Sequence, residues 1–233
     1  LHAADLACDA WVAEGATGLR TSLAALYKNF PAEGYQPEAA LVGHAHLDLV
    51  WLWPEWATER KGVHTAATQL RLMERYPEFR FSQSQPALYR AMERQAPEQM
   101  RAIRKRIDEG RWEIMGGFEV EPDTHLPCGE ALARSLVMGQ AKIAELTGKP
   151  SPVCWIPDVF GYSAILPQVL RLAGVTGFYT TKMTWSTVTR FPYSSFIWRG
   201  ADGSEITTHL CADGYNGEAK VENAMNALAH HRQ

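Results

Sequence analysis

Apolar and polar residues along this chain form segments that favour helices and strands in turn. Apolar residues at helical spacing predict a lead-in helix over 1–28 and a helix that runs through Val63 and ends near Tyr76. Further helices are predicted from Pro97 to Gly110, over 129–146, over 165–172 and from Ala219 onward. Short apolar runs between them predict strands at 39–42, 79–82, 112–115, 153–156 and 178–181. Two further segments, 196–198 and 205–210, flank a Gly-Ala-Asp-Gly sequence typical of a hairpin turn. The alternation predicts an α/β fold with parallel strands.

Polar and aromatic residues gather directly after four of the predicted strands. These clusters are His46-Leu47-Asp48, then 116–123, 157–162 and 182–185. Ligands of barrels and open parallel sheets bind at the carboxyl ends of the strands. We therefore expect the four clusters to converge on one pocket.

The composition narrows the classes of partner. The chain has 233 residues, is 46% hydrophobic, and carries 23 Lys and Arg against 26 Asp and Glu, for a net charge of −3. This balance gives no electrostatic reason to expect nucleic acid or an anionic membrane as a partner, so we expect an uncharged or small one. The chain begins at Leu1 rather than Met, so a leader could have preceded it.

The cysteines and the hydropathy pattern suggest a cytoplasmic protein. No apolar run approaches the roughly 18–20 residues that span a bilayer. The cysteines are far apart and form no Cys-x-x-Cys pair, so neither a zinc ribbon nor a disulfide scaffold is indicated; they are Cys8, Cys128, Cys154 and Cys211.

The segment after the first predicted strand contains candidate metal ligands. His46 and Asp48 are two residues apart, so a strand would direct both side chains to the same face. An imidazole nitrogen and a carboxylate oxygen suit a divalent ion such as zinc. The alternative is that His44, His46 or both are hydrogen-bonded core residues.

Asp158 is the strongest candidate for a third ligand. It follows an apolar strand and Pro157, and it precedes Phe160-Gly161. As Asp often caps helices, a structural role as a helix cap is the alternative. Beside His46 and Asp48, the better interpretation is a ligand whose second oxygen can attack a substrate.

These motifs together resemble the catalytic domain of the zinc-dependent α-mannosidases of glycoside hydrolase family 38. The matching segments are 44–48 with Trp51, Gly116-Gly117 with Pro122-Asp123, and 155–163. Their order and spacing agree from about residue 40 to residue 210, and the elements at 191–193 and 198–204 are most similar to the bacterial and cytosolic type. The resemblance implies a (β/α)7-type barrel with parallel strands. We expect a helical lead-in at 1–38 and the N-terminal part of that barrel, incomplete, at 39–233.

The resemblance also implies an activity: retaining, exo-acting hydrolysis of terminal α-linked mannose from oligosaccharides. By position in the motifs, His46 and Asp48 would bind Zn2+, while Asp158 would bind it and act as the nucleophile. Trp51 would lie against the apolar face of the sugar, and Phe160 would form an aromatic wall of the same subsite.

Four other residues match positions with lesser implied roles. Lys182 falls where the family has a basic residue near the nucleophile, although an isolated lysine is more often solvated. His44 matches a position that supports a neighbouring ligand without binding the metal. Asp123 and Tyr162 are expected to shape loops.

The resemblance places two required groups beyond residue 233. They are the fourth zinc ligand, a histidine, and the general acid, an aspartate. No motif after residue 210 replaces them: His209, His230 and His231 lack the matching context, and Asp213 is at best a subsite residue. We therefore expect a fragment that is inactive alone and binds zinc weakly or not at all.

Two other classes stay open at this point. A metal-dependent polysaccharide deacetylase or amidohydrolase also places His and Asp at barrel strand ends, with a metal-activated water as nucleophile. A non-catalytic sugar-binding domain is the other. The expected partner is an α-mannoside oligosaccharide, and the full-length enzyme could be a homo-oligomer.

Overall fold

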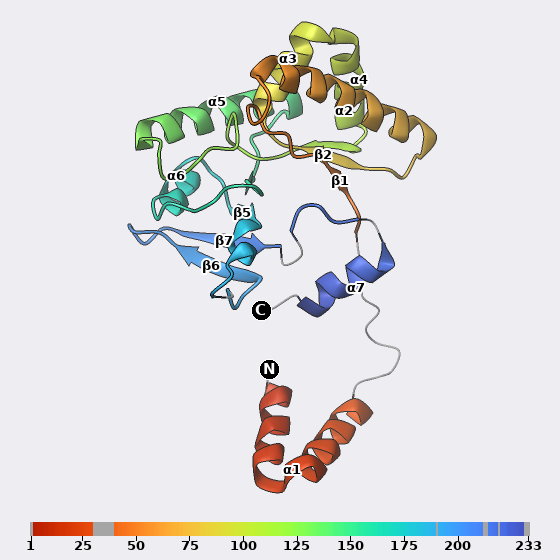
Figure 1. Cartoon of the computed structure of the whole chain (residues 1–233), viewed down its shortest axis with the longest axis vertical. Helices are drawn as coiled ribbons and strands as arrows, with labels where there is room; N and C mark the ends of the chain where they lie inside the picture. The colour runs from red at the N-terminus through yellow and green to blue at the C-terminus, as the bar shows by residue number, and fades with distance from the viewer. Residues whose placement is uncertain (1, 30–39, 190, 212–213, 219, 231–233) are drawn as a thin grey trace. The chain divides into compact units, whose positions relative to one another are not determined.

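The computed structural model describes residues 2–29, 40–189, 191–211, 214–218 and 220–230. It divides into two compact units, Leu1–Ala40 and Leu41–Gln233. The first unit holds α1 (His2–Asn29), whose helical path is broken at Gly15, with φ 63° and ψ −149°. The predicted lead-in helix is therefore present, as two helical stretches that meet at this glycine (Figure 1).

The second unit alternates strands with helices. Its strands are β1 (Gly43–His44), β2 (Phe81–Gln83), β3 (Trp112–Ile114), β4 (Val153–Trp155), β5 (Gly177–Thr180), β6 (Ser195–Arg199) and β7 (Glu205–Leu210). Its helices are α2 (Glu55–Arg75), α3 (Pro86–Gln95), α4 (Pro97–Asp108), α5 (Gly129–Thr147), α6 (Leu166–Leu172), the short 3₁₀ helix η1 (Lys182–Trp185) and α7 (Val221–His230). None of the described helices is long and apolar enough to cross a membrane.

The strands form two sheets that meet at one point. The first sheet has the order β1-β2-β3 and the second β4-β5-β7-β6. All pairs are parallel except β6 with β7, which form the predicted antiparallel hairpin around the turn at 200–203. A parallel bridge between Gly116 and Cys154 joins the end of the first sheet to β4.

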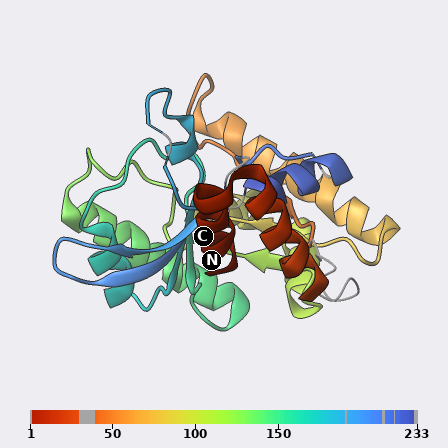
Figure 2. The same cartoon turned by 90° about the horizontal axis from the view of Figure 1, so that it is seen from below.

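The expected (β/α)7 barrel is not confirmed. Among the described residues no strand pairing links β1 to β6, so the two sheets form an open arrangement. The parallel α/β character of the prediction is confirmed, with α2 and the β6–β7 hairpin at opposite sides of the unit (Figure 2).

The predicted first strand was placed too early. β1 begins at Gly43, whereas Leu41 and Val42 are outside any strand and are exposed. Residue 39 lies outside the described residues. Apolar character alone did not make a strand here, because β1 pairs with β2 only from Gly43 onward.

The other predicted elements are present with small shifts. The first predicted helix of this unit begins at Glu55, and the strand expected at 79–82 is β2, two residues later. Helix α3 was not predicted, because its Ser-Gln-Ser-Gln-Pro approach reads as a polar loop. The start expected for the last helix, Ala219, lies outside the described residues.

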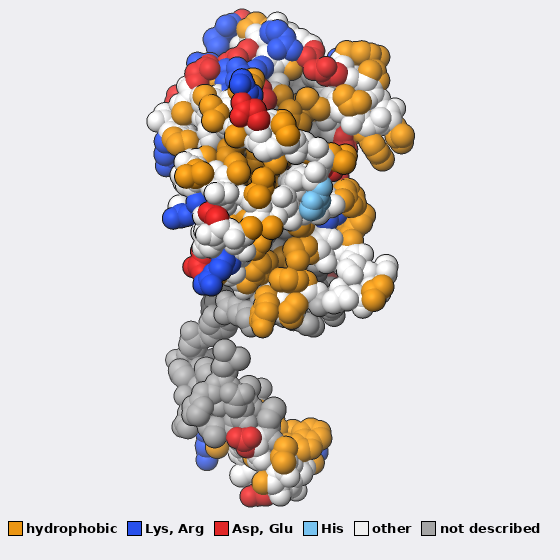
Figure 3. Space-filling view, turned by 90° about the vertical axis from the view of Figure 1, so that its left-hand side faces the viewer, with side chains coloured by type: hydrophobic (Ala, Val, Ile, Leu, Met, Phe, Trp, Pro, Cys, Tyr) orange, Lys and Arg blue, Asp and Glu red, His pale blue; other side chains and the backbone are white. Residues whose placement is uncertain are grey.

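Two apolar cores pack between the sheets and the helices. Alternate strand residues such as Phe81, Trp112, Cys154 and Phe178 are buried in these cores. One core includes residues of α2 to α5, and the other includes residues of α6. Figure 3 views the side of the β6–β7 hairpin, where hydrophobic side chains also reach the surface.

Helix α5 approaches the chain after β3 unusually closely. A Cβ atom on Gly139 would lie 2.2 Å from the carbonyl oxygen of Gly117 and 2.5 Å from the backbone nitrogen of Glu119. Only a glycine lets the helix backbone reach this distance. The contact fixes where the segment after β3 leaves the sheet.

A buried cation joins α5 to α3. Lys142 is almost fully buried, and its Nζ lies 2.7 Å from Oε2 of Glu93 and 2.8 Å from Oε1 of Glu145. Burial alone would raise the pKa of Glu93, but the hydrogen bonds and charges of Lys142 and Arg104 lower it below its usual 4.5. Because the folded-state pKa is lowered, Glu93 contributes stability above its usual pKa and loses it as the pH falls through the folded value.

We expect Glu93→Gln to lower the free energy of unfolding at pH 7 by about 1 kcal/mol, because Glu93 itself is partly exposed and Glu145 still pairs with the buried Lys142. As the pH falls below about 4.5, the free energy of unfolding should also decrease less in the variant than in the wild type. Urea unfolding followed from pH 7 to pH 3 measures both. The matched control is Glu98→Gln on α4, whose exposed side chain pairs with Arg101; an equal effect of the two substitutions would contradict the prediction.

Candidate metal and sugar site

Three predicted ligands meet at the carboxyl ends of β1 and β4. Nε2 of His46 lies 3.4 Å from Oδ1 of Asp48 and 3.4 Å from Oδ2 of Asp158. One donor atom from each residue lies within 4.8 Å of the other two. The sequence separation of 110 residues between Asp48 and Asp158 is bridged because both follow parallel strands.

The geometry of these donors fits a divalent metal ion. Zinc–ligand bonds of about 2.0–2.2 Å in a tetrahedron place neighbouring donor atoms roughly 3.3–3.6 Å apart, which matches both 3.4 Å separations. Nε2 of His46, which faces both carboxylates, is buried and forms no aligned hydrogen bond with a described residue. Buried polar atoms without such bonds are costly unless another group satisfies them.

Glutamine side chains hold the segment that carries His46 and Asp48. Backbone pairing of β1 with β2 ends at His44 and Ser82. Beyond it, Nε2 of Gln83 donates to the carbonyl of Ala45 at 2.8 Å, and Nε2 of Gln85 donates to the carbonyl of Leu47 at 2.6 Å. The side chains thus continue the pairing where the backbone ladder stops.

His44 is engaged through both ring nitrogens. Nδ1 bonds the carbonyl of Ser82 at 3.0 Å, and Nε2 accepts a hydrogen bond from Nε1 of Trp155 at 3.2 Å. Burial lowers the pKa of His44 to about 4, which keeps the ring neutral at pH 7. These bonds leave neither nitrogen of His44 for a metal.

His46 faces acidic groups on both sides of its ring. Opposite to Asp48 and Asp158, Nδ1 lies 3.2 Å from Oε2 of Glu121, whose other oxygen accepts a hydrogen bond from Ser84 at 2.7 Å. Burial alone would lower the pKa of His46, but Glu121, Asp48 and Asp158 raise it above its usual value of 6.5. Three acidic side chains therefore surround one imidazole ring, which favours a bound cation.

The two oxygens of Asp158 face different partners. Oδ2 points to His46, while Oδ1 lies 2.5 Å from Nζ of Lys182, a buried ammonium at the start of η1. Lys182 also lies 3.2 Å from the ring centre of Trp185 and 4.7 Å from that of Phe160. The ring of Phe160 is largely exposed beside this cluster.

Thr124 stabilises the loop that follows Asp158 through two hydrogen bonds. Its hydroxyl donates to the carbonyl of Gly161 at 2.9 Å and accepts from the backbone N–H of Ser163 at 3.0 Å. Asp123 accepts hydrogen bonds from the two N–H groups after Thr124, at 2.7 and 2.8 Å, and so fixes the turn that presents it. The hydroxyl of Tyr162 bonds back to the carbonyl of Val159 at 2.9 Å.

Trp51 lies in the exposed loop that follows Asp48. Its ring is 64% exposed and meets Trp53 edge-on at 5.2 Å. The loop is tied down by the buried hydroxyl of Thr58, which bonds the carbonyls of Asp48 and Leu49 at 2.8 and 2.7 Å. An aromatic face is thus available to solvent a few residues after a predicted ligand.

Tyr215 joins the site from the far end of the chain. Its ring meets that of His46 edge-on at 5.5 Å. Burial and the neighbouring charge of Asp158 raise the pKa of Tyr215 to about 12. The phenol is therefore protonated at neutral pH. Asp213, two residues earlier, lies outside the described residues.

Sequence reasoning missed several residues of this site. Glu121 and Trp185 stand in clusters that were expected to converge, but no role was assigned to them. Gln85 and Tyr215 lie outside those clusters. The only signal for Gln85 was its polarity between a strand and Pro86.

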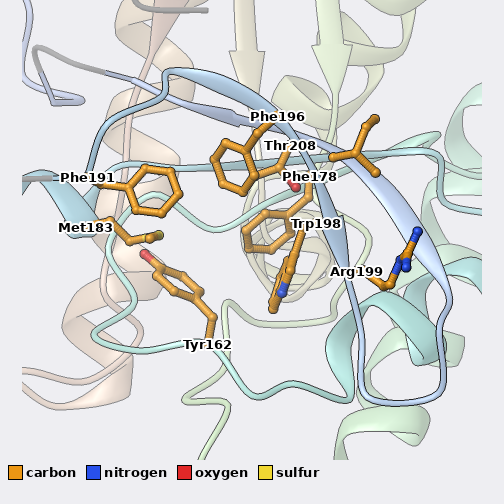
Figure 4. A pocket seen from close by; sticks show the side chains of 9 residues that line it. Tyr162, Phe178, Met183, Phe191, Phe196, Trp198, Arg199 and Thr208 are labelled. Carbon is orange, nitrogen blue, oxygen red and sulfur yellow. The ribbon is translucent and has the colours of Figure 1, made fainter.

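An apolar pocket lies beside the hairpin. It has a volume of about 290 Å³ and is lined by Tyr162, Phe178, Met183, Phe191, Phe196, Ile197, Trp198, Arg199 and Thr208 (Figure 4). Its charged lining residue, Arg199, is at the edge and pairs with Glu205 at 2.6 Å. The pocket therefore lacks the convergent carboxylates of the cluster around Asp158.

The site and fold can be compared with known proteins. A family model described as the glycosyl hydrolases family 38 N-terminal domain matches residues 36–233. Alpha-mannosidase G of Dictyostelium discoideum is 39% identical over 192 residues, and alpha-mannosidase 2C1 of Homo sapiens is 38% identical over 191 residues. Each alignment covers 82% of this chain and 18% of the relative, so the chain spans about a fifth of their length.

A solved structure shares the fold. The crystal structure of an alpha-mannosidase from Enterococcus faecalis V583 aligns with a TM-score of 0.67 and 24% identity, covering 81% of this chain and 22% of that one. Together with the family match over most of the chain, this similarity agrees with the resemblance found in the motifs. The chain belongs to glycosyl hydrolase family 38 and corresponds to the N-terminal domain of that family.

Proposed function

We propose that this chain carries the metal-binding and nucleophilic part of a zinc-dependent, retaining, exo-acting α-mannosidase site. The observation that carries the proposal is the meeting of His46, Asp48 and Asp158 at separations suited to one ion. The names of the relatives support an α-mannoside as the substrate.

The three donors would hold the ion and share it with the sugar. Bound zinc would supply a Lewis acid for the 2- and 3-hydroxyls of a terminal mannose and help to distort its ring. Three protein donors leave the coordination shell open for the sugar and for the fourth ligand, the histidine expected beyond residue 233.

Asp158 would act as the nucleophile through Oδ1. Oδ2 faces His46 and the metal position, so the two oxygens have separate tasks. Lys182 holds Oδ1 in place, and the attacking oxygen must exchange this contact for the anomeric carbon. A retaining mechanism also needs a second carboxyl group about 5–5.5 Å from the first as general acid; we expect it beyond residue 233.

Aromatic side chains would bind the sugar around this centre. Phe160 and Trp185 lie beside Lys182, and Trp51 is exposed in the loop after Asp48. Aromatic faces suit the C–H side of a pyranose. The roles of Trp51, Phe160 and Lys182, a cytoplasmic location and a homo-oligomeric full-length enzyme stay predictions.

Zinc titration tests the metal site directly. We expect the 233-residue chain to bind zinc weakly and His46→Ala to lower this affinity by at least about 100-fold. A substitution that removes only a residue supporting a ligand lowers the affinity by roughly 10- to 100-fold. His64→Ala on the exposed face of α2 is the matched control and should bind like the wild type. Equal zinc affinity of wild type and His46→Ala would contradict the proposed site.

Hydrolysis of an aryl α-mannoside tests the activity. The full-length gene product, taken from the coding sequence around these residues, should hydrolyse it and lose the activity to a chelator. The 233-residue chain alone should not, because the expected general acid is outside it. An enzyme-like rate from the chain alone would disprove that expectation.

A further inference from the structure

Buried polar groups link β2 to the metal position through Glu121. The Ser84 hydroxyl donates to Oε1 of Glu121 at 2.7 Å, and Oε2 of Glu121 lies 3.2 Å from Nδ1 of His46. These last two atoms are buried and face each other without forming an aligned hydrogen bond. Nε2 of the same ring lies 3.4 Å from both Asp48 and Asp158. We propose that Glu121 is a positioning residue that keeps the proton of His46 on Nδ1 and directs the Nε2 lone pair at the metal. This proposal rests on the proposed function and adds to it a residue that none of the matching motifs assigned.

The imidazole ring needs such a partner to act as a ligand. A neutral ring carries one proton, and only the nitrogen without it can bind a metal. A carboxylate accepts but does not donate when ionised, so Glu121 stabilises the ring form with hydrogen on Nδ1. Carboxylates placed in this way behind a ligand histidine fix its orientation and make it more basic.

The position of Glu121 is determined by contacts on both sides. Its side chain is only 6% exposed, with Ser84 against Oε1 and His46 against Oε2. Its backbone N–H donates to Oε1 of Gln85 at 3.4 Å. Gly116 and Gly117 precede it with φ of 119° and 91°, values that turn the chain from β3 toward the site.

Gln85 ties Glu121 to the ligand segment. Its Nε2 donates to the carbonyl of Leu47, between His46 and Asp48, while its Oε1 accepts from Glu121. Gln85 has a φ of 62°, the only positive φ of a described residue other than glycine. Such backbone strain is kept where the surrounding contacts require it. The Gln85 side chain thus holds both the segment that carries His46 and the backbone of Glu121.

A purely structural role for Glu121 makes a different prediction. If it only filled a buried space, the proton position of His46 would not depend on it. If it acted only through its charge, a shorter carboxylate would serve as well. Orientation, by contrast, requires an acceptor at the distance of Nδ1.

The hydrogen on Nδ1 can be observed without any substrate. Saturating zinc occupies Nε2, which otherwise faces Asp48 and Asp158. Two-bond 1H–15N correlation spectra of the zinc-saturated 233-residue chain should then show a hydrogen on Nδ1 of His46 that exchanges slowly with solvent, and this exchange should be faster in Glu121→Leu. Equal exchange in the wild type and the variant would overturn the proposal. That outcome is possible while the protein is still a mannosidase, so the two failures are distinguishable.

Zinc affinity then tests the consequence. We expect Glu121→Leu and Glu121→Asp each to lower the zinc affinity of the full-length protein by roughly 10- to 100-fold. The aspartate keeps the charge but is one methylene too short to reach Nδ1. Wild-type affinity in Glu121→Asp would show that position is unimportant and overturn the proposal.

The matched control lies two residues earlier on the same segment. Glu119→Gln removes a negative charge whose partner is Arg90, 2.8 Å away, rather than His46. Its zinc affinity and the proton position of His46 should equal those of the wild type. A loss as large as that of Glu121→Leu would assign the effect to charge on this segment and overturn the specific role of Glu121.

Discussion

Replacing Asp158 with asparagine is expected to lower kcat/KM of the full-length enzyme for an aryl α-mannoside by at least roughly 10⁴-fold. The amide has nearly the same shape, but its nitrogen or oxygen cannot form the glycosyl ester. It also loses the charge that pairs with Lys182 at 2.5 Å and weakens the donor set around His46. Zinc content measured in parallel separates a lost ligand from a lost nucleophile.

The matched control for this change is Asp202→Asn. Asp202 lies in the exposed hairpin turn, where its carboxylate accepts hydrogen bonds from the backbone N–H and the hydroxyl of Ser204. Its activity should stay within about twofold of the wild type, as expected for a surface position.

A trapped intermediate distinguishes this mechanism from a metal-activated water. Incubation with a 5-fluorinated mannosyl fluoride, which slows turnover and keeps the 2- and 3-hydroxyls, should leave a sugar ester on the peptide that contains Asp158. An active enzyme that forms no ester, or forms it on another residue, would favour the deacetylase-like alternative or another nucleophile.

Gly139→Ala in α5 is expected to lower the free energy of unfolding strongly. The added methyl group would lie 2.2–2.5 Å from three backbone atoms of the segment 117–119, so helix and segment must separate. We expect a loss of about 3 kcal/mol in the free energy of unfolding. In a chain of this size that corresponds to a fall in Tm of roughly 6–12 °C. Thermal and urea unfolding measure the change.

Gly129→Ala at the first turn of the same helix is the control. No atom lies within 4 Å of the Cβ that it would add, so its stability should be unchanged or slightly raised. The displaced segment in Gly139→Ala leads to Glu121, so the variant should also bind zinc less tightly. Equal stability of the two variants would show that the close approach at Gly139 can relax at little cost.

The order of elements in the second unit could be predicted because periodicity and chain breakers agree there. The glycines and prolines around α5 and the hairpin coincide with real ends of elements. Barrel closure was expected from the family and not from any residue in the chain. β1 was misplaced because Leu41 and Val42 are apolar yet lie outside the sheet.

The candidate site could be predicted as far as strand ends determine it. His46, Asp48, Asp158 and Lys182 come directly after strands, and parallel pairing brings them together. The position of Glu121 depends on a glycine-directed turn that no periodicity reveals. Tyr215 follows the last strand by several residues, and only the three-dimensional path places its ring against His46.

The pairing of Gln83 with Ala45 and of Gln85 with Leu47 has a consequence for protein engineering. The geometry of the ligand segment is encoded in a neighbouring strand, through side-chain amides, as much as in the segment itself. Transplanting residues 43–51 alone into another α/β scaffold would carry the ligands without their template. A graft that is to reproduce this centre must include residues 81–86 as a second, co-transferred piece.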